Sequence, residues 1–82
     1  MSTVLTDEQA VKNLSTNLRR LLADRGMSQA ELARTIGESE MNVSRYVRGA
    51  NVPGVGTLAR LSEAFGVPAD YLLSNKIAKK VG

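Results

Sequence analysis

Residues 39–48 carry the side chains of this sequence that are best suited to contacting another molecule. At the 100° per residue of an α-helix, the apolar residues of this segment share one face and the polar residues point the opposite way. The outward side chains are those of Met41, Arg45 and Arg48, with Ser44 and Asn42 on the two flanks and Glu40 at the start of the segment. Arginine binds guanine bidentately, a carboxylate accepts from cytosine, and an apolar methyl group contacts thymine, all in the major groove of DNA. The segment is a candidate base-reading helix, unless it is only an ordinary solvated helix face.

The residue types that enzymes and metal sites use most often are missing. The sequence has no cysteine and no histidine, which removes disulfides, thiolate nucleophiles, the commonest metal ligand and the usual general base. Its eight carboxylates are scattered and form no recognisable catalytic set. At 82 residues the chain forms one small domain with a thin core, so a surface function is favoured. We therefore expect no enzyme, no metal site and no cofactor.

The net charge of +3 gives little support to a nucleic-acid partner by itself. Residues 1–75 contain eight basic and eight acidic residues, which cancel. The whole excess comes from three lysines near the end of the chain: Lys76, Lys79 and Lys80. Affinity for nucleic acid must therefore come from where the charges lie on the folded surface.

Capping residues and apolar spacing predict a long first helix over residues 7–25. Thr6 and Gln9 form a capping-box pattern at its start, and Gly26 fits its end. Residues 15–17 are mediocre helix formers, so the first turns are the weaker part of this prediction.

Two shorter helices are predicted over residues 29–36 and about 39–48. Ser28 with Glu31 forms a second capping box, and Ser39 is expected to cap the third helix. A glycine follows each of the two segments, as is common at the ends of helices.

Residues 50–56 are expected to form an exposed loop, because proline, glycine and asparagine interrupt regular structure there. Thr57 is expected to cap a fourth helix that ends at Gly66, and Pro68 fits the first turn of a short fifth helix. The sequence contains no strand-like alternation of useful length and no internal repeat. The predicted class is all-α, a compact bundle of five helices.

Three stretches of the sequence together match a known pattern. "SQAELARTIG", "SRYVRG" and "LARLSEAFGVPADYLL" resemble the helix-turn-helix DNA-binding domain of the lambda-repressor/Cro type (XRE-like). Ala33 is small enough for two helices to approach closely, and Gly37 suits the left-handed conformation of the turn. The resemblance covers residues 14–73. It implies a five-helix lambda-repressor-like domain whose second helix crosses the phosphate backbone and whose third helix enters the major groove.

The resemblance also implies roles for individual positions of this sequence. The positions implied to read bases are Glu40, Met41, Ser44 and Arg45. The positions implied to contact phosphates are Gln29, Ser39, Asn42, Arg48 and Asn51. In such an interface, phosphate contacts set register and affinity, while base contacts set the sequence preference.

Some positions depart from the family's pattern. Glu38 stands in the turn where the family usually has an apolar residue, so we expect the turn to be more exposed here. Glu40 stands where many relatives have glutamine, which implies either more selective or weaker binding to the operator. Leu22 and Val47 occupy the places of a buried ion pair found in some relatives. Because both are apolar, no single charge is left buried.

The sequence divides into an N-terminal extension (1–13), expected to be partly helical and continuous with the first helix, the helix-turn-helix domain (14–73) and a basic tail (74–82). One small domain reads only a few base pairs, and useful selectivity generally needs two half-sites. We therefore expect a homodimer. Its expected interface residues are Tyr71, Leu72, Leu73 and Ile77, although the first three could simply close the core.

The sequence thus predicts a sequence-specific transcriptional regulator, most simply a repressor, that binds a palindromic double-stranded DNA operator as a homodimer. No apolar run reaches membrane-spanning length and no signal region is present, so we expect a cytoplasmic protein. The resemblance implies that it is bacterial or phage-encoded and associated with the nucleoid. A phage repressor, a restriction controller and an antitoxin-type autoregulator are not separated by the sequence. The alternative from another class is a protein-interaction module on the same fold, which would use Met41 and the loop near Val52.

Overall fold

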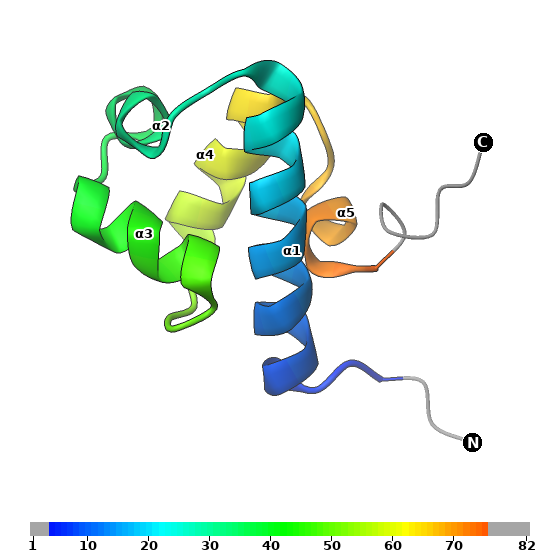
Figure 1. Cartoon of the computed structure of the whole chain (residues 1–82). Coiled ribbons are helices and arrows are strands. Elements are labelled where there is room, and N and C mark those ends of the chain that lie inside the picture. Colours follow the sequence, from blue (N-terminus) through cyan, green and yellow to red (C-terminus); the bar gives the residue numbers. More distant parts are fainter. Residues whose placement is uncertain (1–3, 76–82) are drawn as a thin grey trace.

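The computed structural model describes residues 4–75 and contains five α-helices (Figure 1). They are α1 (Asp7–Arg25), α2 (Gln29–Ile36), α3 (Glu40–Arg48), α4 (Val55–Phe65) and α5 (Ala69–Leu73). The described residues contain no strand, and none of their helices is both long and apolar enough to cross a membrane. The predicted all-α class is confirmed, and α1, α2 and α3 have the boundaries that their capping residues indicated.

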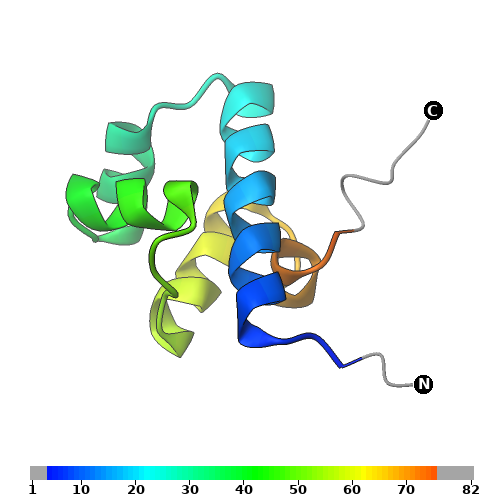
Figure 2. The ribbon, with the colours of Figure 1, turned by 60° about the horizontal axis from the view of Figure 1, so that its bottom comes forward.

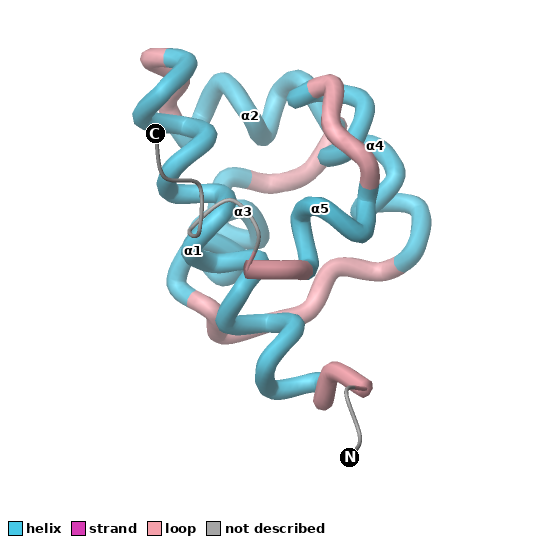
Figure 3. Tube along the Cα trace, turned by 90° about the vertical axis from the view of Figure 1, so that its right-hand side faces the viewer, coloured by secondary structure: helices cyan, strands magenta, loops and turns pink. Residues whose placement is uncertain are grey.

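The helix α1 stands in the middle of the arrangement. The helices α2 and α3 lie on one side of it, and α5 lies on the other side together with both ends of the described chain (Figure 1, Figure 2). The principal contacts join α1 to α3, α3 to α2, α2 to α4, α4 to α5 and α5 to α1. These contacts close a ring of five helices. Figure 3 shows the helices from the α5 side, with the loops that connect them in pink.

Apolar side chains from all five helices fill the centre of this ring. The largest of those that are fully buried are Leu14, Leu18, Leu32, Ile36, Val43, Leu61 and Leu72. Burying one such side chain contributes about 1.5–3 kcal/mol, so this cluster supplies most of the favourable free energy of folding. The spacing of three and four residues that predicted the helices also places these side chains on their inner faces.

Two asparagines of α1 hold the end of α5. The Nδ2 group of Asn17, which is buried, donates to the carbonyl oxygen of Leu72 at 2.7 Å. The Nδ2 group of Asn13 donates to the carbonyl oxygen of Leu73 at 3.0 Å. The last carbonyls of a helix have no partner within the helix itself, so α1 supplies the partners that α5 lacks. The stretch of α1 with the weakest helix propensity therefore fastens α5, and α1 runs through it without a break.

The final carbonyls of α2, α3 and α4 accept hydrogen bonds from arginines of other helices. These bonds run from Arg60 Nε to Ile36 O at 3.0 Å, from Arg19 Nη1 to Val47 O at 3.0 Å, and from Arg25 Nη2 to Phe65 O at 2.7 Å. A cation at the C-terminal end of a helix also interacts favourably with the helix dipole. Each helix from α2 to α5 is therefore closed by a side chain of another helix.

The start of α4 differs from the sequence prediction. The helix begins at Val55 with Gly54 as its N-cap residue, so the prediction that Thr57 caps it is wrong. The hydroxyl of Thr57 instead donates to Oε2 of Glu38 at 2.7 Å. An N-cap residue stands just before the first helical residue, whereas Thr57 is the third residue of α4 and already lies inside its first turn.

Replacing Asn17 with aspartate is expected to destabilise the domain. Asn17→Asp keeps the shape of the side chain, but it removes the Nδ2 donor and turns a carboxylate toward backbone carbonyls, so the free energy of unfolding should fall by about 1–3 kcal/mol or more. Urea titration measures this change. The matched control is Asn51→Asp, because the exposed Asn51 uses its Oδ1 atom to accept from the Val52 amide and aspartate keeps that acceptor. The control should change stability by less than about 0.5 kcal/mol. Equal losses in both variants would contradict the role of Asn17.

Candidate nucleic-acid interface

The helix α3 has one buried face and one exposed face. The buried side chains are Val43, Tyr46 and Val47. The exposed side chains are Glu40, Met41, Arg45 and Arg48, with Ser44 half-buried. This is the division that the helical spacing predicted. The side chains of α3 that are able to contact another molecule therefore share one surface.

A tight turn joins α2 to α3. The helix α2 is followed by Gly37, whose φ of +70° lies in the left-handed region that favours glycine. The helix α3 then begins after its N-cap residue Ser39, whose hydroxyl accepts from the backbone amide of Asn42 at 3.1 Å. Ala33 of α2 is buried, and its small side chain allows the two helices to pack closely. This is a helix-turn-helix geometry in which α3 is the helix with the exposed polar face.

The first turn of α2 is capped by its own side chains. The amide of Glu31 donates to the Ser28 hydroxyl at 3.0 Å, and the amide of Ser28 donates to the Glu31 carboxylate at 2.9 Å. Gln29, the first residue of α2, is half-buried beside this cap. The dipole of the helix favours an anion at this end, although the Glu31 carboxylate already lies there.

The far end of α3 is tied to α1. The hydroxyl of Ser15 and the guanidinium of Arg19 both donate to the carbonyl oxygen of Val47. Gly49, with a φ of +74°, ends α3 so close to α1 that a Cβ atom there would lie 3.4 Å from the Cβ of Ser15. The apolar Leu22 and the Val47 side chain are buried in the core. The polar link between α1 and α3 is thus made to the backbone of α3 rather than by a buried ion pair.

A groove of about 680 Å³ lies beside this end of α3, between α1 and the loop that follows α3. Its lining includes the basic side chains of Lys12, Arg19 and Arg48, the amide of Asn51 and the acidic side chains of Asp7 and Glu8. Sequence reasoning gave the α1 residues of this groove no role. No local motif marks them, because their place beside the loop depends on how α3 packs against α1.

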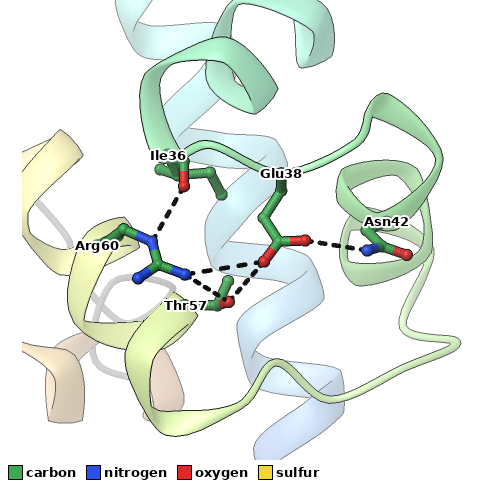
Figure 4. Close-up of polar contacts among 5 residues, drawn as sticks. All are labelled: Ile36, Glu38, Asn42, Thr57 and Arg60. Carbon is green, nitrogen blue, oxygen red and sulfur yellow. Dashed lines mark hydrogen bonds and ion pairs between the residues drawn. The ribbon is translucent and has the colours of Figure 1, made fainter.

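The turn residue Glu38 is the centre of a polar cluster that joins the turn to α3 and α4 (Figure 4). Its Oε1 atom accepts from Nδ2 of Asn42 at 2.9 Å, and its Oε2 atom accepts from the Thr57 hydroxyl at 2.7 Å. The Nη2 atom of Arg60 lies 3.9 Å from Oε2 and donates to the Thr57 hydroxyl at 3.3 Å. Only 18% of the Glu38 side chain is exposed, so the prediction that this residue leaves the turn more exposed is wrong at Glu38, although Gly37 and Ser39 on either side of it are exposed. The carboxylate points inward because two donors and a cation compensate its charge.

These contacts hold the pKa of Glu38 below its ordinary value. The hydrogen bond from Asn42 has the largest effect and the one from Thr57 follows, while partial burial opposes them and the charge of Arg60 adds to them. Burial raises the pKa of Tyr46, and the nearby Glu38 carboxylate raises it further. At neutral pH, Glu38 is therefore charged and Tyr46 is neutral.

The residues expected to contact phosphates are placed differently from one another. Arg48 and Asn51 are exposed at and just beyond the end of α3, and Arg48 Nε donates to the Ser44 hydroxyl at 3.3 Å. Ser39 and Asn42 already have partners within the domain, the first as the N-cap of α3 and the second through Glu38. Ser39, Arg48 and Asn51 are exposed, whereas Gln29 and Asn42 are half-buried.

The helix α5 is only partly available to a second copy of the chain. Leu72 is 0% exposed and closes the core, which contradicts its predicted place in a dimer interface. Tyr71 and Leu73 are half-buried and still present some surface. Ile77 lies outside the described residues.

The fold and this surface define a helix-turn-helix protein, with α2 and α3 as the motif. A family model described as helix-turn-helix matches residues 18–72. The chain therefore belongs to the helix-turn-helix family, in its XRE or lambda-repressor-like form. The resemblance that the sequence motifs indicated is confirmed.

Individual proteins of known kind are similar to this chain. It is 31% identical over 61 residues to the cryptic phage CTXphi transcriptional repressor RstR of Vibrio cholerae. That match covers 74% of this chain and 55% of RstR, so the chain spans about half the length of this relative. A hypothetical transcription factor from Neisseria, NHTF, has a TM-score of 0.79 at 29% identity, covering 96% of this chain and 90% of that one. The SOS-response transcriptional repressor LexA from Eubacterium rectale shares the fold, with a TM-score of 0.80 at 24% identity over 96% and 83% of the two chains.

The Glu38 cluster is expected to make the stability of the domain depend on pH in the acidic range. Because folding lowers the pKa of Glu38, its ionised form stabilises the fold at neutral pH. This contribution is lost as the pH falls from about 4.3 toward the lowered pKa. The difference in free energy of unfolding between the wild type and Glu38→Gln should be largest near neutral pH and shrink on acidification, which urea titrations at several pH values measure.

The control for this prediction is Glu63→Gln, which removes the same charge from an exposed position of α4. It should change stability little at any pH. A difference for Glu38→Gln that stays constant or grows on acidification would show that its carboxylate is not stabilised by the fold.

Proposed function

We propose that this protein is a sequence-specific transcription regulator that inserts α3 into the major groove of double-stranded DNA. The observation that carries the proposal is the exposed polar face of α3, held opposite its buried stripe by the packing of α2 across the turn at Gly37. The major groove is about 12 Å wide and admits an α-helix. Membership of the helix-turn-helix family, similarity to a protein named as a transcriptional repressor and similarity to one named as a hypothetical transcription factor support the same function. Its expected location, in the cytoplasm with the nucleoid, follows from this proposal.

The base-reading residues have complementary chemistry. Arg45 suits the two acceptors of guanine, the Glu40 carboxylate suits the amino group of cytosine, and the apolar end of Met41 suits the methyl group of thymine. Ser44, half-buried at the edge of the same face, reaches either a base or the backbone. A short run of base pairs is therefore distinguished by one helix.

The residues proposed to contact phosphates lie on α2, at the start of α3, and at and beyond the end of α3. Gln29 stands at the start of α2, where the helix dipole favours an anion, and Arg48 and Asn51 stand at the end of α3 and beyond it. Ser39 and Asn42 complete the set at the start of α3, in addition to their contacts inside the domain. These contacts carry no sequence information, but they fix the register in which α3 meets the bases.

We further infer that the protein binds a palindromic operator as a homodimer and represses by occupying it. A helix of nine residues reads only a few base pairs, so selectivity requires two half-sites related by two-fold symmetry. The helix α5, which contains Tyr71 and Leu73, lies on the other side of α1 from α3 (Figure 1). A contact between two copies through α5 leaves the reading face of each copy free.

A protein-interaction module on the same fold is the second candidate, and an antitoxin-type autoregulator would combine both functions. Met41 and Val52 are 63% and 60% exposed, and an apolar surface of this kind suits a protein partner. Binding of such a partner would depend little on salt, whereas binding to DNA depends on it steeply.

Selection of bound duplexes from random double-stranded DNA tests the proposal. A palindromic consensus is expected, with half-site centres about 10 base pairs apart. Affinity for the selected duplex should fall steeply between about 50 and 200 mM salt, because phosphate contacts release bound counterions. Failure to prefer any duplex at low ionic strength would overturn the proposal.

Arg45→Ala and Arg48→Ala are expected to weaken binding in different ways. Arg45→Ala should cost about 1–3 kcal/mol on the selected duplex and relax the preference at one base pair. Arg48→Ala should weaken binding to selected and scrambled duplexes about equally. Each variant is the control for the other, because both remove one positive charge from α3. Fluorescence anisotropy with the two duplexes measures the effects, and identical profiles would refute this division of roles.

A further inference from the structure

We propose that Glu38 is a positioning residue, which acts through Asn42 and Thr57. It sets the orientation of the first helical turn of α3, here called the base-reading turn because it carries Glu40 and Met41, and so contributes to sequence selectivity. The inference rests on the proposed function, since it concerns how the same helix meets DNA. Glu38 itself lies in the turn before α3 and only 18% of its side chain is exposed. Its effect on DNA binding is therefore exerted through the residues that it holds.

The first turn of α3 is fixed at Asn42 in two ways. The backbone amide of Asn42 donates to the Ser39 hydroxyl at 3.1 Å, and its side-chain Nδ2 donates to Oε1 of Glu38 at 2.9 Å. Glu40 and Met41, which are proposed to read bases, lie between Ser39 and Asn42 in the sequence. They therefore belong to the turn of helix that these two contacts hold.

The other side of Glu38 is anchored on α4. Its Oε2 atom accepts from the hydroxyl of Thr57, a residue of α4 that is only 7% exposed. Arg60, one turn further along α4, donates to the Thr57 hydroxyl and also to the carbonyl oxygen of Ile36 at the end of α2 (Figure 4). Thus α4 holds the end of α2, the turn and, through the turn, the start of α3.

This route matters because α3 has no other extensive contact with α4. The principal packing partners of α3 are α1 and α2, and its far end is tied to α1 through the Val47 carbonyl. Polar readout needs donors and acceptors placed to within about 0.5 Å, which requires the supporting residues to be held rigidly. The Glu38 cluster supplies that rigidity at the end of α3 that carries Glu40 and Met41.

A purely stabilising role makes a different prediction. If the cluster only raised the folded fraction, its loss would lower binding to selected and scrambled duplexes in the same proportion. If it positions the reading turn, its loss lowers the ratio of the two affinities, because contacts with bases depend on orientation more than contacts with phosphates do.

The test uses Thr57→Val, because Thr57 is too buried to contact DNA and valine keeps its shape while losing the hydroxyl. Ser62→Ala is the matched control, since it removes from the same helix a hydroxyl that donates to Val67 O, away from the turn. With selected and scrambled duplexes, Thr57→Val should lower the affinity ratio by about 3- to 30-fold. Ser62→Ala should leave the ratio unchanged, even where both variants are less stable than the wild type.

A second measurement does not depend on DNA. Hydrogen exchange at the backbone amides of Asn42 and Val43, both bonded to Ser39, should be faster in Thr57→Val than in Ser62→Ala, relative to the exchange of the core amides. The conservative variant Thr57→Ser keeps the hydroxyl and should restore both the affinity ratio and the exchange rates.

The outcomes separate the inference from the function on which it rests. An unchanged affinity ratio in Thr57→Val, or equal falls in both variants, would overturn the positioning role and leave the DNA-binding function intact. A wild type that prefers no duplex would overturn the function instead. In that case, unchanged exchange at the start of α3 would still overturn the claim that Glu38 holds this turn.

Discussion

Hydrogen bonds from the side chains of one helix to the final carbonyls of another hold this domain in a single arrangement. The last carbonyls of a helix lack partners within it, and a buried carbonyl left unpaired costs about 1–3 kcal/mol. The donors are Asn13, Ser15, Asn17, Arg19 and Arg25 of α1, which close α3, α4 and α5, and Arg60 of α4, which closes α2. Burial of leucines is favourable but has no direction. These bonds therefore decide where α3, α4 and α5 end along α1, and where α2 ends against α4.

The same constraint separates the scaffold from the surface that we propose reads bases. The helix α3 is held at its end by α1 through the Val47 carbonyl and at its start by the Glu38 cluster, while its inner face packs in the core. Glu40, Met41 and Arg45 lie outside all three of these supports and are exposed. Their identities can therefore change the chemistry of the surface without changing the fold that presents it.

Signals that depend on neighbouring residues predicted the structure well. Capping boxes, left-handed glycines and apolar spacing are local, so the bounds of α1, α2 and α3 and the outward face of α3 could be read from the sequence. The two errors at Thr57 and Glu38 have one cause, since these residues are partners of each other across 19 positions and each was interpreted alone. The groove beside α3 was missed, and the place of Leu72 was left open between the core and a dimer interface, for a similar reason, because both depend on how helices pack. The assignment of DNA as partner came from the family resemblance more than from the charge.

Both ends of the described chain lie with α5 on the side of α1 away from the helix-turn-helix motif (Figure 1, Figure 2). The points where the described residues begin and end are thus set apart from the surface that we propose binds DNA. An additional module fused at either point would lie on the α5 side of the domain and would not cover the proposed recognition surface. This architecture lets one recognition unit be coupled to many different outputs, because what is tethered behind it can be exchanged without redesigning what lies in front.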